Sequence, residues 1–203
     1  SGVVADADRI YVSNGHNDSV SVVDARSLEV TSEIPIRIPG LESLRGVLPT
    51  GLALADGWLL VAETGINAVG VIDAGAGKLL GHLPAGWFPT RVLVDRGMVY
   101  VANAKGHGTG PNASMQRPYP ASYQGELRRG SISRFALPRA SELGRHTAGV
   151  MRMNGFVPLA REPSPIPSEI RHVVLIVKEN RTFDEVFGDV GQASNGPVAG
   201  AYD

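Results

Sequence analysis

The residues best suited to do chemistry lie near the carboxyl end of the chain. An apolar run over 173–177 is followed by Lys178 and then by Glu179 and Asn180. Five consecutive aliphatic residues predict a strand buried on both faces, as in a parallel sheet. Polar groups at the carboxyl end of such a strand lie where α/β sheets bind ligands. A carboxylate and an amide oxygen there are suitable ligands for a hard divalent cation.

A helix is predicted to begin directly after this polar segment. Thr182 and Glu185 have the spacing of a capping box, in which each side chain hydrogen-bonds the other's backbone. Glu179 and Asn180 would then lie in the turn between strand and helix. The residues alone leave open a second interpretation, in which the strand ends in a salt bridge and an ordinary asparagine turn.

The longer motif over 174–184 resembles the opening motif of the phosphoesterase branch of the alkaline-phosphatase superfamily. That branch includes phosphatidylcholine-type phospholipases C and related acid phosphatases. The resemblance implies that Glu179 and Asn180 bind a divalent metal ion, while Arg181 and Asp184 support them by ion pairing and by orienting the helix. The metal ion would stabilise the transferring phosphoryl group and help to activate a Ser or Thr nucleophile. In that family the nucleophile and the remaining metal ligands lie further along than Asp203, so we expect no catalytic nucleophile here and an inactive chain by itself.

The first two thirds of the chain contain an internal repeat. Apolar β-prone runs recur over 10–14, 59–63 and 99–103, and the first two are each followed at the same distance by a second run, over 20–24 and 69–73. Fourth strands are expected over 28–34 and 79–83. Short antiparallel strands repeating every ~40–50 residues are typical of β-propeller blades. The repeats resemble the YVTN-type β-propeller, with Tyr-Val-Ser-Asn at 11–14 and Tyr-Val-Ala-Asn at 100–103.

The repeat predicts a mainly β fold with about three four-stranded blades. A β-sandwich built from a meander is the alternative. We expect Asp24 and Asp73, which close the third strands, to hydrogen-bond the following turns. A closed propeller has at least four blades, and three would leave sheet edges exposed. We therefore expect the chain to be a fragment, with the remaining blades supplied by the parent chain or by another copy.

An insertion interrupts the third blade at about 105–129. It opens with alternating glycines and carries basic and tyrosine side chains, which suit a loop that faces a phosphate-bearing substrate or a neighbouring domain. A plain flexible loop is the alternative. The layout of propeller, Gly-rich loop and catalytic motif is similar to bacterial proteins that fuse a propeller to an alkaline-phosphatase-like domain. The candidate residues of this loop are Lys105, His107, Arg117, Arg128 and Arg129.

A helix and a proline-rich linker separate the repeat from the catalytic motif. The helix is expected to begin with Ser141 as its N-cap and to end at Asn154 and Gly155. Its buried face is predicted to contain Leu143, Thr147, Val150 and Met151. Prolines crowd residues 158–167, which predicts an extended linker. The predicted domains are a partial propeller over 1–137, a helix and linker over 138–170, and the start of the phosphoesterase domain over 171–203.

Composition excludes several classes of protein. The 203 residues include no cysteine, so disulfides and thiolate metal sites are impossible. The formal net charge of −1 lacks the basic excess of a nucleic-acid binder. No apolar run is long enough to cross a membrane, and residues 1–4 do not resemble a signal peptide. The family resemblance nevertheless implies an extracytoplasmic location, either periplasmic or secreted.

Three functions are compatible with these patterns. The first is hydrolysis of phosphate mono- or diesters by a metal-dependent parent protein, of which this chain is a part. The second is a non-enzymatic propeller that binds or scaffolds partners and closes by oligomerisation, with two copies forming a six-bladed ring. The third is a propeller lactonase or lyase, for which the sequence shows no convincing set of acidic or histidine residues.

Overall fold

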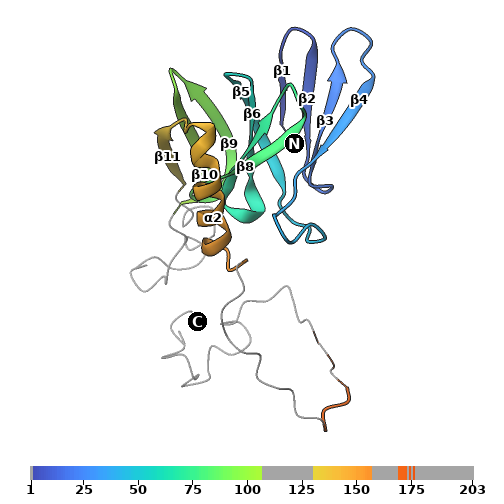
Figure 1. Ribbon diagram of the computed structural model, residues 1–203, viewed down its shortest axis with the longest axis vertical. Helices are drawn as coiled ribbons and strands as arrows, with labels where there is room; N and C mark the ends of the chain where they lie inside the picture. The colour runs from blue at the N-terminus through green and yellow to red at the C-terminus, as the bar shows by residue number, and fades with distance from the viewer. Residues whose placement is uncertain (1, 107–129, 157–168, 173, 175, 177–203) are drawn as a thin grey trace, which may run out of the picture. The chain divides into compact units, whose positions relative to one another are not determined.

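The computed structural model describes residues 2–106, 130–156, 169–172, 174 and 176. The chain divides into two compact units, one formed by Ser1–Thr109 with Gln124–Val157 and one by Gly110–Tyr123 with Pro158–Asp203. Every described strand and helix belongs to the first unit. Its architecture is mainly β, and its described residues form three antiparallel sheets and one α-helix (Figure 1).

Each sheet is a meander in which neighbours in sequence are neighbours in space. The first sheet contains β1 (Val3–Ala5), β2 (Arg9–Asn14), β3 (Ser19–Asp24) and β4 (Val30–Pro35). The second contains β5 (Pro49–Ala55), β6 (Trp58–Glu63), β7 (Ala68–Asp73) and β8 (Lys78–Pro84), with the 3₁₀ turn η1 (Thr64–Ile66) between β6 and β7. The third contains β9 (Trp87–Asp95), β10 (Met98–Gly106) and β11 (Ser131–Ala136). The two predicted fourth strands are confirmed as β4 and β8.

The tight hairpins follow from residues that tolerate a left-handed backbone. Asp56 and Gly57 have φ of 51° and 79°, and Arg96 and Gly97 have φ of 46° and 74°. Two consecutive positive φ values define the type I′ turn, whose twist matches that of the flanking strands. These turns set the registers of β5 against β6 and of β9 against β10.

The first strands of the three sheets lie against one another. A Cβ atom on Gly51 of β5 would stand 2.6 Å from the carbonyl oxygen of Thr90 and 2.7 Å from Cα of Arg91, both in β9. A Cβ on Gly2, beside β1, would clash with the carbonyl of Thr50 in the same way. Three separate four- or three-stranded meanders that meet along their first strands form a partial β-propeller. A β-sandwich has two sheets that enclose one core, whereas here three separate sheets follow one another with an apolar cluster between each pair, which excludes the alternative.

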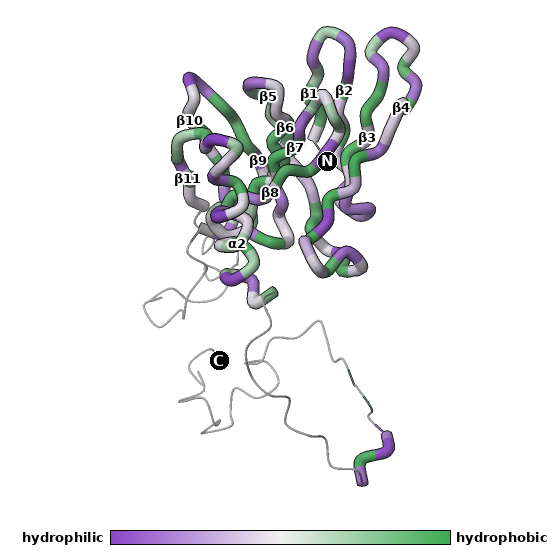
Figure 2. Tube along the Cα trace, in the orientation of Figure 1, coloured by the Kyte–Doolittle hydropathy of each residue, from purple (hydrophilic) through white to green (hydrophobic). Residues whose placement is uncertain are grey.

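The second sheet is the most buried of the three. Every residue of β7 from Ala68 to Ile72 is buried, as is all of β6 after Trp58. The hydropathy colouring in Figure 2 shows the apolar character of these strands, which lie between the other two sheets. One apolar cluster, centred on Tyr11 and Leu59, joins the first two sheets, and a second, centred on Leu60 and Val99, joins the second and third.

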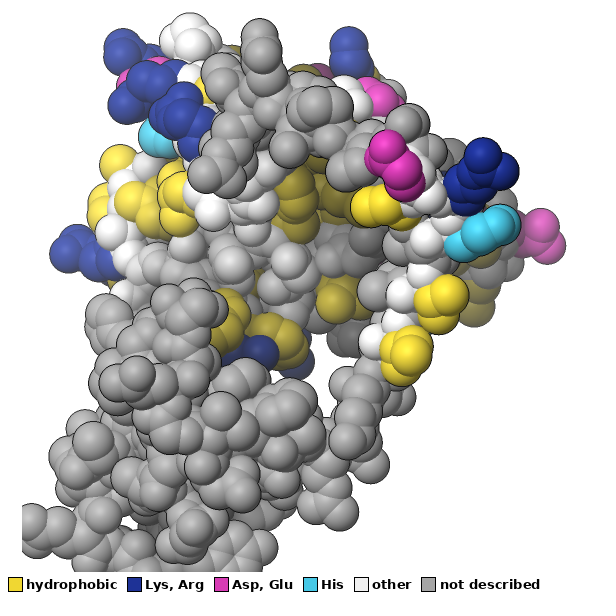
Figure 3. All heavy atoms as spheres, turned by 90° about the horizontal axis from the view of Figure 1, so that it is seen from below, with side chains coloured by type: hydrophobic (Ala, Val, Ile, Leu, Met, Phe, Trp, Pro, Cys, Tyr) yellow, Lys and Arg dark blue, Asp and Glu magenta, His cyan; other side chains and the backbone are white. Residues whose placement is uncertain are grey.

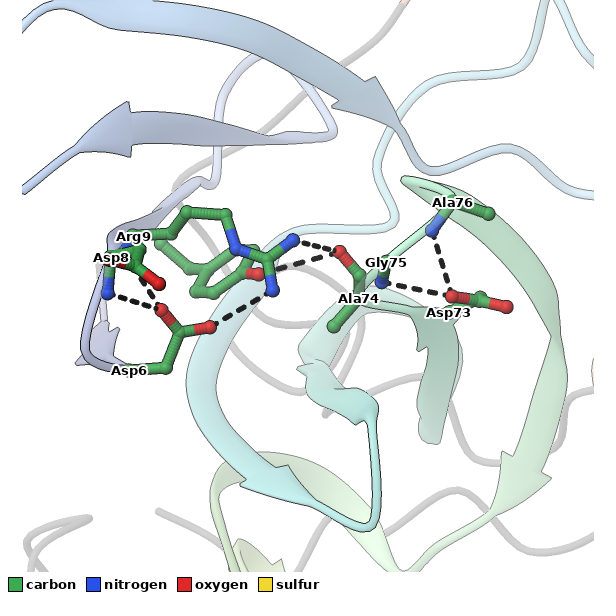
Figure 4. Close-up of polar contacts among 8 residues, drawn as sticks. Asp6, Asp8, Arg9, Asp73, Ala74, Gly75 and Ala76 are labelled. Carbon is green, nitrogen blue, oxygen red and sulfur yellow. Dashed lines mark hydrogen bonds and ion pairs between the residues drawn. The ribbon is translucent and has the colours of Figure 1, made fainter.

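Polar contacts also join the first and second sheets (Figure 4). The guanidinium of Arg9 donates to the carbonyl of Ala74 at 2.6 Å and pairs with Asp6 at 3.1 Å. Tyr11, over whose ring Arg9 lies, donates to the same carbonyl at 3.5 Å. Arg9 therefore connects the start of β2 to the turn after β7.

The structure confirms the predicted role of the aspartates that end the third strands. Oδ1 of Asp73 accepts the backbone N–H groups of Gly75 and Ala76 at 2.9 and 2.8 Å. Asp24 accepts those of Ser27 and Arg26 in the same manner, and these bonds hold the pKa of Asp24 below its ordinary value. Both side chains stabilise turns.

The helix begins differently from the prediction. Ser141 is not an N-cap, because it lies inside the 3₁₀ turn η3 (Ala140–Glu142) that precedes α2 (Leu143–Met153). The carboxylate of Glu142 accepts the backbone N–H of Arg139 at 2.9 Å and so stabilises this start. The predicted end is confirmed, since Gly155 has a φ of 68° directly after Asn154.

After β11 the chain leaves the third sheet, which has three strands in the described residues rather than the four expected of a blade. Leu143 and Val150 of α2 are buried, and the helix packs on β8, the last strand of the second sheet. Oγ1 of Thr147 accepts the backbone N–H of His82 at 2.9 Å. The predicted buried face of the helix is therefore confirmed, and it covers the second sheet.

The described residues of the carboxyl-terminal segment form no strand. Val174 and Ile176, which belong to the predicted buried strand, are each 83% exposed. A strand buried on both faces needs neighbouring strands and helices, and the part of the chain that the structure describes provides none for them. The rest of that segment and the linker over 158–167 lie outside the described residues. No described helix combines the length and the apolar character needed to span a membrane.

Candidate functional site

Most of the predicted site residues lie outside the described residues. This holds for Glu179, Asn180, Arg181 and Asp184 of the catalytic motif. It also holds for the insertion residues His107, Arg117, Arg128 and Arg129. The structure therefore places one predicted site residue, Lys105, at the end of β10.

Lys105 lies over two aromatic rings at the start of β9. Its Nζ is 5.1 Å from the ring centre of Trp87 and 4.7 Å from that of Phe88. Trp87 is 46% exposed, and its backbone is paired with Gly106, from which the insertion leaves the sheet. Cation–π attraction stabilises this cluster. The exposed indole beside a fixed positive charge offers a surface that can bind a planar or anionic group.

Phe88 is held in an unusual backbone conformation. Its φ of 62° is left-handed, which bulky residues adopt only where the surroundings enforce it. Here Oδ1 of Asn67, itself at a φ of 54°, accepts the backbone N–H of Phe88 at 2.9 Å. The second sheet thus fixes the aromatic cluster of the third.

A chain of hydroxyl groups, carried by β2, β5 and η1, connects the three sheets. Ser13 donates to the carbonyl of Thr50 at 2.6 Å. The hydroxyl groups of Thr50 and Thr64 are 2.9 Å apart, and Thr64 donates to the carbonyl of Pro89 at 2.6 Å. Each hydroxyl satisfies a backbone carbonyl, so this chain of bonds joins the sheets and is not arranged as a nucleophile with its base.

The second sheet contains a fully buried acid–histidine pair that sequence reasoning did not identify. Nδ1 of His82 is 2.8 Å and 3.0 Å from the two carboxylate oxygens of Glu63, and the side chains are 1% and 0% exposed. The pair spans β6 and β8 over Gly70 of β7. A Cβ on Gly70 would collide with the Glu63 carboxylate, so the glycine makes room for the contact.

The same repeat position is occupied differently in the other two sheets. Asn14 of the first sheet donates to Ser21 at 2.8 Å, and Asn103 of the third donates to Ser133 at 2.9 Å. Glu63 replaces the asparagine in the second sheet, and Gly70 replaces the serine. The sequence signal that could have revealed the pair is this joint departure from the repeat.

Electrostatics favour the protonated form of the His82 ring. Burial of His82 by itself would lower the pKa of the ring, but the charge of Glu63 and the hydrogen bond to its carboxylate outweigh burial and raise that pKa above its ordinary value of 6.5. Nε2 of His82 finds no hydrogen-bond partner among the described residues. Because both side chains are shut away from solvent, the pair is suited to holding the sheet together rather than to acid–base catalysis of an external substrate.

The described residues contain no metal-binding cluster, and one pocket among them lies beside the helix. They contain no group of three or more His, Cys, Asp or Glu side chains that could hold a metal ion. A mainly apolar pocket of about 220 Å³ lies between β8, β11 and α2, with His146 among its lining residues. On the face seen in Figure 3, hydrophobic side chains lie among charged side chains of both signs.

The fold and these sites define a partial β-propeller module. No known family model matches the chain, and no curated protein matches it. Among solved structures, the hydrazine synthase of Kuenenia stuttgartiensis is similar over 51% of this chain and 28% of its own, with 23% identity and a TM-score of 0.44. A streptogramin B lyase is similar over 70% and 42%, with 14% identity and a TM-score of 0.44.

A virginiamycin B lyase of Staphylococcus aureus, in a catalytically inactive variant with quinupristin, is similar over 46% of this chain and 30% of its own. It has 15% identity and a TM-score of 0.38. The chain thus spans less than half the length of each of these three proteins. Similarity at this level assigns no activity, and the assignment of a partial propeller comes from the sheets themselves.

Proposed function

We propose that this chain carries part of the propeller and the first metal-binding residues of a metal-dependent phosphoesterase that hydrolyses phosphate mono- or diesters. The observation that carries the proposal is the motif over 174–184, with Glu-Asn-Arg-Thr-Phe-Asp after an apolar run, in the same chain as a partial propeller. The propeller would serve as a binding or positioning module. The catalytic chemistry would belong to the segment that begins with this motif.

The donor set of the motif fits the proposed cofactor. The Glu179 carboxylate and the Asn180 amide oxygen are hard ligands of the kind that divalent metal ions such as Mg²⁺, Ca²⁺ or Mn²⁺ accept. A bound ion would neutralise charge on the transferring phosphoryl group. Two ligands leave most of a coordination shell unfilled, so the proposal requires further Asp or His ligands and a Ser or Thr nucleophile from beyond this motif.

Hydrolysis by the complete gene product tests the proposal. We expect that polypeptide to hydrolyse 4-nitrophenyl phosphate or bis(4-nitrophenyl) phosphate, to lose activity with EDTA and to regain it with a divalent metal salt. Glu179→Gln removes a charged ligand and should reduce kcat/KM at least ~100-fold, the scale of losing an electrostatic contact to the reacting group. Glu162→Gln, in the proline-rich segment, is the matched control and should keep full activity. Metal-loaded protein without hydrolysis of either ester would contradict the proposal.

A non-enzymatic propeller that binds partners is the second candidate. The exposed Trp87 beside Lys105 favours it, because an aromatic side chain with a fixed cation is a common element of binding surfaces. If the complete gene product is inactive as an esterase, this cluster becomes the first surface to test.

We also propose a periplasmic or secreted location for the parent protein, on the family resemblance of the motif. Fractionation of the source cells, with detection by an antibody against this chain, tests it. Recovery of the protein with the cytoplasmic fraction would contradict this proposal and would leave the assignment of activity to the hydrolysis assay.

A further inference from the structure

A mainly apolar pocket lies where α2 meets the second and third sheets, and its volume is about 220 Å³. Voids in close-packed protein interiors are seldom larger than a water molecule, whereas concave apolar pockets with a few polar groups are typical of ligand sites. The pocket is therefore a candidate site for a small ligand. Its lining residues are Leu83 and Pro84 of β8, Phe135 and Ala136 of β11, Pro138, and His146 of α2.

The walls of the pocket are held by contacts that need no occupant. Leu83 is 1% exposed and belongs to the apolar cluster that joins the second and third sheets, and Phe135 packs against the same cluster. Leu143 of α2 also belongs to that cluster. Oγ1 of Thr147 accepts the backbone N–H of His82 at 2.9 Å, which fixes the helix on β8. Because each wall is anchored separately, the pocket is part of the fold.

The volume and the lining of the pocket suit a single aromatic ring. An apolar cavity of ~150 Å³ holds benzene. With about 220 Å³, this pocket has room for one such ring and a substituent of a few atoms. Phe135 offers an aromatic surface for edge-to-face or offset stacking. Ala136 is an exposed member of the lining, so the pocket opens to solvent and a ligand has a way in.

His146 supplies the polar side chain of the lining, and it is partly buried. An imidazole carries at least one N–H group whether it is neutral or protonated, so it donates to an acceptor in both states. A hydrogen bond to a charged acceptor is stronger than one to a neutral acceptor. A negatively charged substituent on the ring therefore gains more from His146 than a neutral substituent does.

The charges around the pocket also favour an anion. The three elements that line it, β8, β11 and α2, contain no Asp or Glu along their described lengths, and their Lys and Arg side chains are all cationic. The carboxylate of Glu142, before the helix, pairs with Arg139 and Arg145. Asp56 lines a separate depression together with Arg139. These three elements therefore present no carboxylate to repel an anion, and their positive charge attracts one.

We propose that this pocket binds a small aromatic carboxylate. The ring packs against Leu83 and Phe135, and the carboxylate accepts an N–H from His146. The inference does not depend on the proposed esterase activity, because every residue that lines the pocket belongs to the partial propeller and the helix that packs on it.

Calorimetric titration of the 203-residue chain with benzoate tests the class of ligand. We expect benzoate to bind at one site with a Kd of about 1 mM, a strength that a ligand of this size reaches in a well-formed pocket. Benzamide has the same shape without the charge and should bind at least about fivefold more weakly. Acetate lacks the ring and should show no saturable binding. Benzoate that does not saturate, or benzamide that binds as tightly, would overturn the proposal.

Two alanine replacements test the location of the site. Ala136→Trp places an indole at the exposed part of the lining and should weaken benzoate binding at least about tenfold, because it fills the space that the ring needs. Ala148→Trp, at an exposed position of α2 outside the lining, is the matched control and should bind benzoate as the wild type does. Circular dichroism establishes that both variants are folded. Equal affinity of the two variants would show that benzoate does not bind in this pocket.

Replacement of the histidine tests the contact with the carboxylate. His146→Leu keeps the lining apolar and removes the N–H donor, so benzoate binding should weaken about fivefold or more and the preference for benzoate over benzamide should disappear. His16→Leu changes an exposed histidine outside the lining and should keep that preference. A His146→Leu variant that still prefers benzoate to benzamide would overturn the assignment of His146 as the donor.

Discussion

The pair of Glu63 and His82 shows how a repeat can change its polar chemistry without changing its backbone. Asn14 and Asn103 bind serines of the adjacent strand, whereas Glu63 passes over Gly70 to reach β8. A buried acid–histidine contact is often taken as a sign of catalysis. Here complete burial and the equivalent amides in the other sheets indicate a structural role.

The pair makes stability depend on pH. The folded state raises the pKa of His82, so it favours the protonated ring. The stabilisation is complete below about pH 6.5, the ordinary pKa, and it is lost as the pH rises through the folded pKa. We expect the free energy of unfolding, measured with urea between pH 5 and pH 9, to fall on the alkaline side of this range.

Replacement of the histidine separates this effect from the other titrating groups. His82→Gln keeps a donor for Glu63 but cannot titrate, so the decline above pH 6.5 should flatten in this variant. His16→Gln changes an exposed histidine and should leave the decline intact. A wild-type protein whose stability rises steadily from pH 5 to pH 9 would show that the pair does not titrate as described.

At the scale of elements, two glycines near the contact of α2 with β8 have opposite surroundings. A Cβ on Gly81 of β8 would stand 2.6 Å from Oγ1 of Thr147, the atom that accepts the N–H of His82. A Cβ on Gly149 of α2 would meet nothing within 4 Å. The first glycine is required for contact, while the second only weakens the helix.

Alanine at these two positions should therefore have opposite effects. Gly149→Ala should raise the free energy of unfolding by about 1 kcal/mol, because alanine is the better helix former. Gly81→Ala should lower it by about 1–3 kcal/mol, because the methyl group forces the helix off the strand. Thermal or urea unfolding measures both. Equal effects of the two changes would contradict the packing of α2 described here.

At the scale of the whole unit, the sheets are joined where their first strands meet. Gly51→Ala would push a methyl group into the backbone of β9, so we expect it to lower the free energy of unfolding by about 2 kcal/mol or more. Gly15→Ala, whose Cβ would lie 3.4 Å from the Pro49 carbonyl, should change it by less than about 1 kcal/mol. If Gly51→Ala is as stable as the wild type, the close approach of β5 and β9 is wrong.

The sequence predicted the elements of this unit better than their contacts. Repeat spacing and turn residues located the strands, because period-two alternation and Asp-Gly turns are local properties. The predicted N-cap at Ser141 was wrong because Glu142 provides the capping contact at the start of the 3₁₀ turn. The buried pair of Glu63 and His82 was missed, since its partners are 19 residues apart and meet only through the register of three strands. The predicted metal ligands Glu179 and Asn180 remain predictions.

The return of α2 to the second sheet determines how this unit would bear a mechanical load. A pull on the chain beyond Phe156 would act first on the helix, on its contact with β8 and on the hydrogen bonds of Asn154 to Ile66 and Val150. These contacts resist as a group, whereas a pull applied directly to β11 would open its ladder with β10 one bond at a time. The third sheet is therefore protected from tension transmitted along the chain, although among the described residues it has the fewest strands.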